Sequence, residues 1–172
     1  MAAGLAWLAR IPPTSAAWVA DPADPSSLVP PADYLVDVLP GTLLFGLGIA
    51  LLVAPLTTAL MGSVPAGRAA LGSAINNAVS RVGSPLASAA LFMVISATFV
   101  PALLAAVPDL TAEAAAALGI APLFPPPDGA SPELAAAITA ASTDAFRLAM
   151  VVAAALLGAG ALVSFLGLER RR

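Results

Sequence analysis

The chain of 172 residues contains no cysteine, no histidine and no lysine. Without cysteine it can form no disulfide, no thiolate nucleophile and no Cys-ligated metal site. Without histidine and lysine it also lacks the most common general base and the amine that forms Schiff bases. These absences argue against an enzyme, and we predict no catalytic residues, no metal site and no cofactor.

Charge is scarce as well. Only 10% of the residues are charged, all seven basic residues are arginine, and the formal net charge is −3. Binding to nucleic acid needs a basic face that neutralises phosphates. The sequence therefore predicts no nucleic-acid partner.

Apolar residues are abundant instead, at 60% of the chain, and the mean hydropathy is +0.97. Three segments carry no charge at all: 38–67, 82–108 and 148–168. The hydrocarbon core of a bilayer, about 30 Å thick, is crossed by roughly 20 apolar residues in a helix. We therefore predict an all-α membrane protein with three transmembrane helices and a lipid bilayer as its main surroundings.

The order of apolar and polar segments predicts an alternating topology. Positive charge marks the cytoplasmic side of a span, and arginine occurs in the short link at Arg68 and in the tail at 170–172, whereas acids fill the long loops. The expected location is the plasma membrane, with the C-terminus in the cytoplasm. We predict the end of a truncated transmembrane helix at 1–9, an outer loop at 10–38, a transmembrane helix at 39–63, a cytoplasmic turn at 64–67, a transmembrane helix at 68–100, an outer loop with short helices at 101–143, a transmembrane helix at 144–167 and a cytoplasmic tail at 168–172. An alternative for 1–9 is a frayed apolar N-terminus.

The middle predicted span carries polar side chains on one face. Polar residues recur there every three or four positions, so they line one side of a helix, and polar groups facing hydrocarbon are costly. We expect this face to meet another helix or a substrate cavity. Its members are Ser73, Asn77, Ser80, Ser84 and Ser88, and Asn76 lies beside them.

Arg81 lies beside this face and has two interpretations. If the helix starts near Ala66, Arg81 lies roughly 20 Å along it, near the middle of the membrane, where an arginine indicates a functional site. If a span begins at Val82 instead, Arg81 lies at the cytoplasmic interface and extends its side chain toward water.

Proline and threonine mark further candidate positions. Pro55 removes a backbone donor and is expected to bend the first span near Leu51, while Thr57 and Thr58 are expected to bond back to freed carbonyls or to point into a cavity. Pro85 is a second predicted kink. Glycines of the first and last spans predict close helix packing, or reflect only the high frequency of glycine in membrane helices. They are Gly41, Gly46, Gly48, Gly158, Gly160 and Gly167.

Segments 40–48, 55–57 and 62–83 together resemble the C-terminal part of a major facilitator superfamily transporter. The resemblance is to the fourteen-span drug:proton antiporters of the EmrB and QacA type, whose penultimate helix follows a V-P-x-x-R-A turn. Pro65, Arg68, Asn76 and Asn77 match that pattern in place, whereas Arg81 is displaced by one position. The resemblance implies a partial major facilitator fold whose partners are the missing N-terminal transporter helices, a small-molecule substrate and protons.

Two functions follow as hypotheses. The first is a C-terminal fragment of a secondary active transporter, with proton-coupled efflux of drugs or other small molecules implied by the resemblance. The second is a small non-catalytic membrane protein that assembles or regulates a membrane complex through its glycine-lined helices.

Overall fold

The structure is a computed structural model that describes residues 1–15, 18, 20–62, 64–119 and 122–169. Within these residues all regular structure is helical and no strand occurs. Three helices are long and apolar enough to cross a membrane: Tyr34–Ala59, Ala69–Ala106 and Pro132–Leu166. The predicted all-α class with three such helices is confirmed. The α-helices are α1 (Ala2–Leu8), α2 (Leu39–Gly62), α3 (Ala69–Ala106), α4 (Ala112–Leu118) and α5 (Pro132–Glu169).

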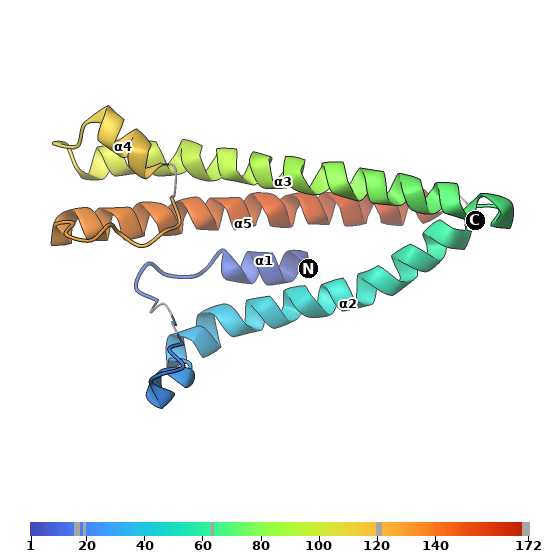
Figure 1. Cartoon of the computed structure of the whole chain (residues 1–172), viewed down its shortest axis with the longest axis horizontal. Helices are drawn as coiled ribbons and strands as arrows, with labels where there is room; N and C mark the ends of the chain where they lie inside the picture. The colour runs from blue at the N-terminus through green and yellow to red at the C-terminus, as the bar shows by residue number, and fades with distance from the viewer. Residues whose placement is uncertain (16–17, 19, 63, 120–121, 170–172) are drawn as a thin grey trace.

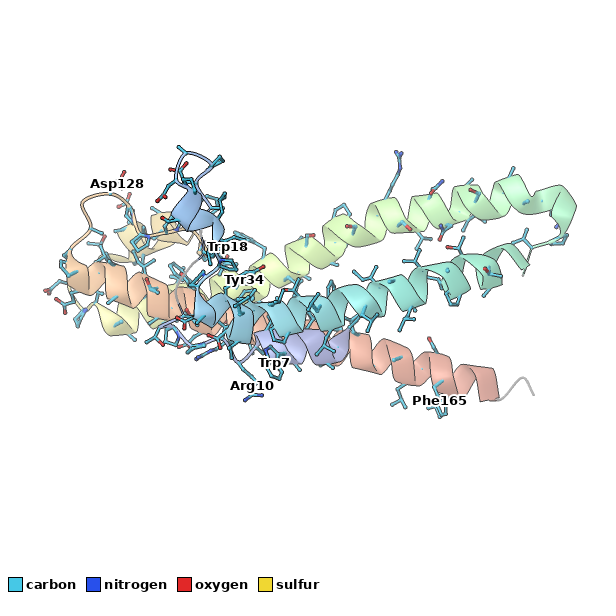
Figure 2. All side chains as sticks on the ribbon, turned by 90° about the horizontal axis from the view of Figure 1, so that it is seen from below. Trp7, Arg10, Trp18, Tyr34, Asp128 and Phe165 are labelled. Atoms are coloured by element: carbon cyan, nitrogen blue, oxygen red, sulfur yellow. The ribbon has the colours of Figure 1, made fainter. Side chains whose placement is uncertain are left out.

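The three long helices run lengthwise, with α1 lying between α2 and α5 (Figure 1). The described residues of segments 10–33 and 107–131 lie together at one end, which we call the loop end. The link 64–68 and the last turn of α5 lie at the opposite end, which we call the turn end. Asp128 and Phe165 mark the two ends in Figure 2, where α3 and α5 diverge toward the turn end.

Two of the long helices extend further toward the loop end than the predicted spans. α3 continues to Ala106 and α5 begins at Pro132, so each has 38 residues. The Ser131 hydroxyl accepts a hydrogen bond from the Leu134 N–H at 3.2 Å, as an N-cap does. No proline or glycine follows between 133 and 157, so α5 is one helix that covers both the end of the predicted outer loop at 101–143 and the predicted span at 144–167.

A small core joins α3, α4 and α5 at the loop end. Phe99 and Leu103 are its largest fully buried side chains. Thr111 caps α4 by accepting the Ala114 N–H at 3.2 Å. Where α4 ends, a Cβ built on Gly119 would lie 2.6 Å from Val100 Cγ2, so a larger residue there would force the Val100 side chain to shift. The rest of the core consists of Ala115, Ile138, Ala141 and Ala145.

The contact between α1 and α2 depends on glycine. A Cβ built on Gly4 would lie 2.6 Å from both the Gly41 carbonyl oxygen and the Phe45 nitrogen, so the two backbones touch. Gly41 and Gly48 of α2 contact Leu8 and Met1 of α1, respectively. Small residues at helix crossings allow such close approach. By contrast, Gly46, Gly158 and Gly160 have open space around them, and the surroundings of Gly167 lie outside the described side chains.

The loop before α2 folds on its own aromatic and acidic side chains. The rings of Trp18 and Tyr34 meet edge to face with centroids 4.9 Å apart, and Trp18 Nε1 donates to the Ser27 carbonyl at 2.8 Å. Asp24 accepts hydrogen bonds from the Ser26 hydroxyl and N–H. These two bonds hold the pKa of Asp24 below its ordinary value.

Candidate functional site: the polar face of α3

The polar side chains predicted for the middle span all lie on the first 20 residues of α3, and every one of them is exposed. Within the part of the chain that the structure describes, none of these side chains makes a hydrogen bond. The surface formed by Ser73, Asn76, Asn77, Ser80, Arg81, Ser84 and Ser88 is called the polar face below.

The register of α3 shows where the polar face points. Ala87 and Leu91 follow Ser80 and Ser84 by seven residues, which is two helical turns, so these positions share one side of the helix. Ala87 and Leu91 line a cavity of about 430 Å³ enclosed by α1, α2, α3 and α5. The side of the polar face that carries Ser80 and Ser84 is therefore directed toward the turn-end continuation of that central space, whereas Ser88, next to Ala87, is not among the residues that line the cavity. On its other sides the cavity is lined by apolar residues that include Leu5, Phe45, Met150 and Leu156.

Arg81 lies inside one continuous helix. It follows the first residue of α3 by twelve positions, about 18 Å along the axis. Pro85 has no N–H with which to bond the Arg81 carbonyl, and among the described residues no carboxylate pairs with the guanidinium. A cation at such a depth in lipid needs water or a polar partner. Despite Pro85 and Pro101, α3 stays helical throughout.

The prolyl segment of α2 differs in detail from the expectation. α2 remains helical through Pro55. The Thr57 hydroxyl donates to the Val53 carbonyl at 2.8 Å, and the Thr58 hydroxyl donates to the Ala54 carbonyl at 3.0 Å. Because Pro55 has no N–H, the Leu51 carbonyl four residues before it has no backbone donor in the helix. Neither threonine hydroxyl bonds to that carbonyl. Both threonines are exposed, and neither is among the residues that line the 430 Å³ cavity.

The predicted turn residues lie at the turn end. The Arg68 N–H donates to the Pro65 carbonyl at 2.8 Å, which closes the turn before α3. A Cβ on Gly72 would lie 2.9 Å from Val64 Cγ2, so the link packs on the first turn of α3. The Arg68 side chain is exposed.

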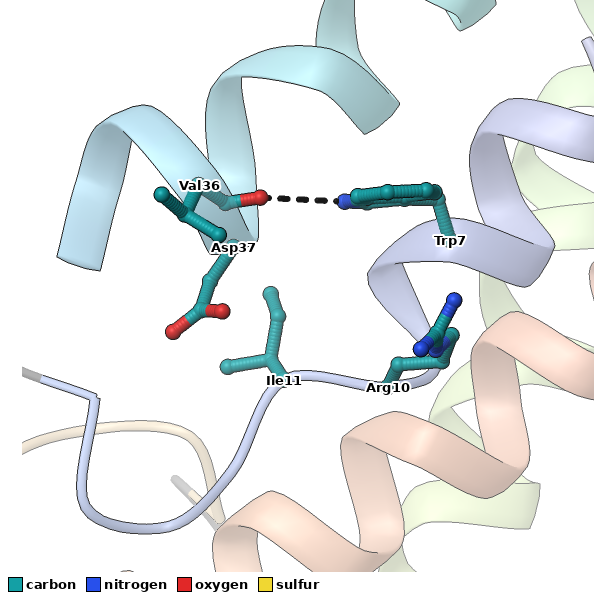
Figure 3. A pocket seen from close by; sticks show the side chains of 5 residues that line it. All are labelled: Trp7, Arg10, Ile11, Val36 and Asp37. Atoms are coloured by element: carbon teal, nitrogen blue, oxygen red, sulfur yellow. Dashed lines mark hydrogen bonds between the residues drawn. The ribbon is translucent and has the colours of Figure 1, made fainter.

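A second, smaller cavity of about 220 Å³ lies at the loop end between α1 and the start of α2 (Figure 3). Trp7 Nε1 donates to the Val36 carbonyl at 3.2 Å, and the Arg10 guanidinium carbon lies 5.2 Å from the centre of the Trp7 ring. Ile11 and Asp37 complete the lining. Over the described ranges no cluster of three or more carboxylates exists that could hold a metal ion.

Sequence analysis missed Arg147, which ties α5 to the segment after α1. Arg147 Nε donates to the Ile11 carbonyl at 2.8 Å, and Nη1 lies 3.1 Å from Asp144 Oδ1. The spacing of Asp144 and Arg147 by three residues could have identified the ion pair. The bond to Ile11 depends on how the chain folds and has no signal in the sequence.

We expect Arg147→Ala to lower the free energy of unfolding by about 1 kcal/mol, at the low end for a charged hydrogen bond because a third of the side chain is exposed. Asp144→Asn removes only the exposed ion pair and is expected to have a smaller effect. Thermal unfolding in detergent compares the two variants. Equal losses would show that the bond to Ile11 contributes nothing.

Comparison with known proteins finds similarity to a multidrug resistance protein over part of the chain. The chain is 45% identical over 76 residues to the multidrug resistance protein Stp of Mycobacterium tuberculosis, in both strain CDC 1551 / Oshkosh and strain ATCC 25618 / H37Rv. The match covers 42% of this chain and 14% of each relative, so the chain spans about one-seventh of their length. No protein-family model and no solved structure matches it.

Proposed function

We propose that this chain is the C-terminal part of a secondary active transporter that exports drugs or other small molecules in exchange for protons. The observation that carries the proposal is the similarity to a multidrug resistance protein, in a chain with three helices able to span a membrane. This similarity and the residue inventory both favour transport over catalysis. Proton coupling is taken from the resemblance to the fourteen-span antiporters.

The polar face supports the proposal because it needs a neighbour. Side chains such as Asn76, Asn77 and Ser80 are hydrogen-bonding groups in a helix surrounded by apolar segments. Secondary transporters bind substrate near the middle of the bilayer between two helical halves. In our proposal the polar face borders that site or packs on the helices of the other half, and Arg81 meets a carboxylate or carbonyl there.

The proposed orientation puts the turn end in the cytoplasm. Arg68 and the arginines at 170–172 belong to the link and the tail, whereas most carboxylates lie in the loops of the other end. This distribution follows the positive-inside rule for short loops. Labelling of single cysteines introduced at Arg68 and Asp128, in intact cells and in inverted vesicles, tests the orientation.

Transport is tested in membrane vesicles that contain this chain together with a polypeptide supplying further transporter helices. We expect export of an apolar cationic dye that stops when a protonophore collapses the proton gradient, and no export by this chain alone. Export by the chain alone would contradict the proposed need for a partner. Absence of export, combined with co-purification of an unrelated membrane complex, would favour the assembly function instead.

In the same vesicles Arg81→Ala is expected to reduce the transport rate at least about tenfold, since it removes the charge at a depth where a polar partner is required. Arg68→Ala at the exposed turn is the matched arginine control and is expected to retain most activity. Equal activity of Arg81→Ala and the wild type would remove Arg81 from the proposed site.

A further inference from the structure

A groove between α2 and α5 continues the space that α1 occupies. In the described part of the chain no Cα atoms of α2 and α5 lie within 8 Å of each other, and α1 packs against both helices. Beyond the first turn of α1, toward the turn end, the two helices enclose a groove of about 690 Å³. Its walls are Gly48, Leu52 and Leu56 from α2 and Leu156, Leu157, Gly160, Ala161 and Ser164 from α5, with Met1, Ala2 and Ala3 at its head.

The α2 wall of the groove is the same helical face that already binds α1. Gly41, Phe45, Gly48, Leu52 and Leu56 follow one another by three or four residues, so they form one stripe. The first three of them contact α1. The last two extend the stripe past α1 with no helix opposite them.

The chemistry of the groove suits an apolar helix. No charged side chain lines it, Ser164 supplies its one polar side chain, and the amino group of Met1 lies at its head. Gly48 and Gly160 have no side chains to fill the groove, so the backbone of another helix can approach closely there. Each wall extends over nine residues, about 12 Å or two helical turns.

We propose that this groove receives an apolar transmembrane helix whose axis continues that of α1. Such a helix would contact α2 through the stripe that α1 uses and would contact α5 at Leu157, Gly160 and Ser164. It would hold α2 and α5 together at the turn end as α1 does toward the loop end. The proposal depends on the placement of the helices in a membrane and not on transport.

Cross-linking of engineered cysteines tests this contact, because the natural chain has none. The full chain is extended before Met1 by fourteen alternating leucines and alanines, with one cysteine seven residues ahead of Met1. That cysteine is expected at the level of Leu56 and Ser164, because α1 runs opposite to α2 and α5. Oxidation in membranes should join it to Ser164→Cys at least about fivefold more than to the exposed neighbour Val163→Cys, because a disulfide forms only between close Cα atoms.

A groove-filling variant provides the matched control. Gly160→Leu fills the groove, whereas Gly158→Leu adds the same side chain on α5 outside it, and both glycines have room for a Cβ. We expect Gly160→Leu to reduce the cross-link at least about fivefold and Gly158→Leu to leave it unchanged.

Three outcomes would overturn the proposal. The first is equal cross-linking at Ser164→Cys and Val163→Cys, and the second is an unchanged cross-link in Gly160→Leu. The third is an intermolecular cross-link of Ser164→Cys between two unextended chains, which would show that a second copy occupies the groove. None of these measurements involves transport. If the groove proposal fails, the proposed function is therefore still tested separately by the vesicle assay.

Discussion

Phe99→Ala is expected to lower the free energy of unfolding by about 3–5 kcal/mol, the range for removing a buried aromatic ring. Phe99 is 1% exposed and packs with Leu103 between α3, α4 and α5. The alanines of α4 and α5 around it are too short to fill the cavity that the ring would leave. Denaturation of the purified protein in mild detergent, followed by near-UV circular dichroism, measures the loss.

The same helix provides the control for this prediction. Phe92 lies two turns earlier on α3 and is 48% exposed, so Phe92→Ala is expected to change the stability by less than about 1 kcal/mol. Phe99→Leu keeps most of the volume and is expected to lose less than about 1.5 kcal/mol. If Phe92→Ala and Phe99→Ala were equally destabilising, the core at the loop end would not hold the three helices together.

Gly4→Leu is the second substitution with a large expected effect, about 3 kcal/mol of destabilisation or more. The new Cβ would lie 2.6 Å from backbone atoms of Gly41 and Phe45. Backbone atoms cannot rotate out of the way as a flexible side chain can, so α1 must separate from α2. Because α1 is the element that packs against both α2 and α5, the variant is expected to release α2 from the rest of the protein.

Proteolysis and detergent titration measure this release. Gly46→Leu on α2 has open space around its Cβ and is expected to behave like the wild type. Resistance of Gly4→Leu equal to that of Gly46→Leu would show that α2 is held by contacts other than those with α1.

The helical class could be predicted because the length of an uncharged segment is a property of the sequence itself. The residues at the ends of α4, Thr111 and Gly119, could likewise be identified from local chemistry. The capping signals at 131–133 mark where a helix begins. They do not show whether this helix ends before the predicted span at 144–167 or continues into it. For this reason the single helix α5 was divided into a short helix and a span.

Contacts between distant segments could not be predicted in this way. Nothing in residues 1–9 indicates that Gly4 meets Gly41, because glycine has no side chain whose pattern could reveal its partner. Arg147 beside Asp144 has the spacing of an ordinary surface ion pair, so its bond to the Ile11 carbonyl was missed. The prediction for Thr57 and Thr58 had the right type of bond but the wrong acceptors, since a threonine in a helix bonds the carbonyl four residues before it.

The position of the core along the long helices has a consequence for how the protein responds to denaturants. At about 57 Å, α3 and α5 are much longer than the hydrocarbon layer, and the core lies level with the charged side chains of Asp144 and Arg147. In the membrane placement that we propose, the turns near Leu156 lie in lipid and the core around Phe99 lies in water, so water drives the association of apolar groups at the core whereas lipid offers no such drive. Urea weakens the burial of apolar groups from water, so in this placement it should open the α4 cap while leaving the turns of the same two helices in lipid wound.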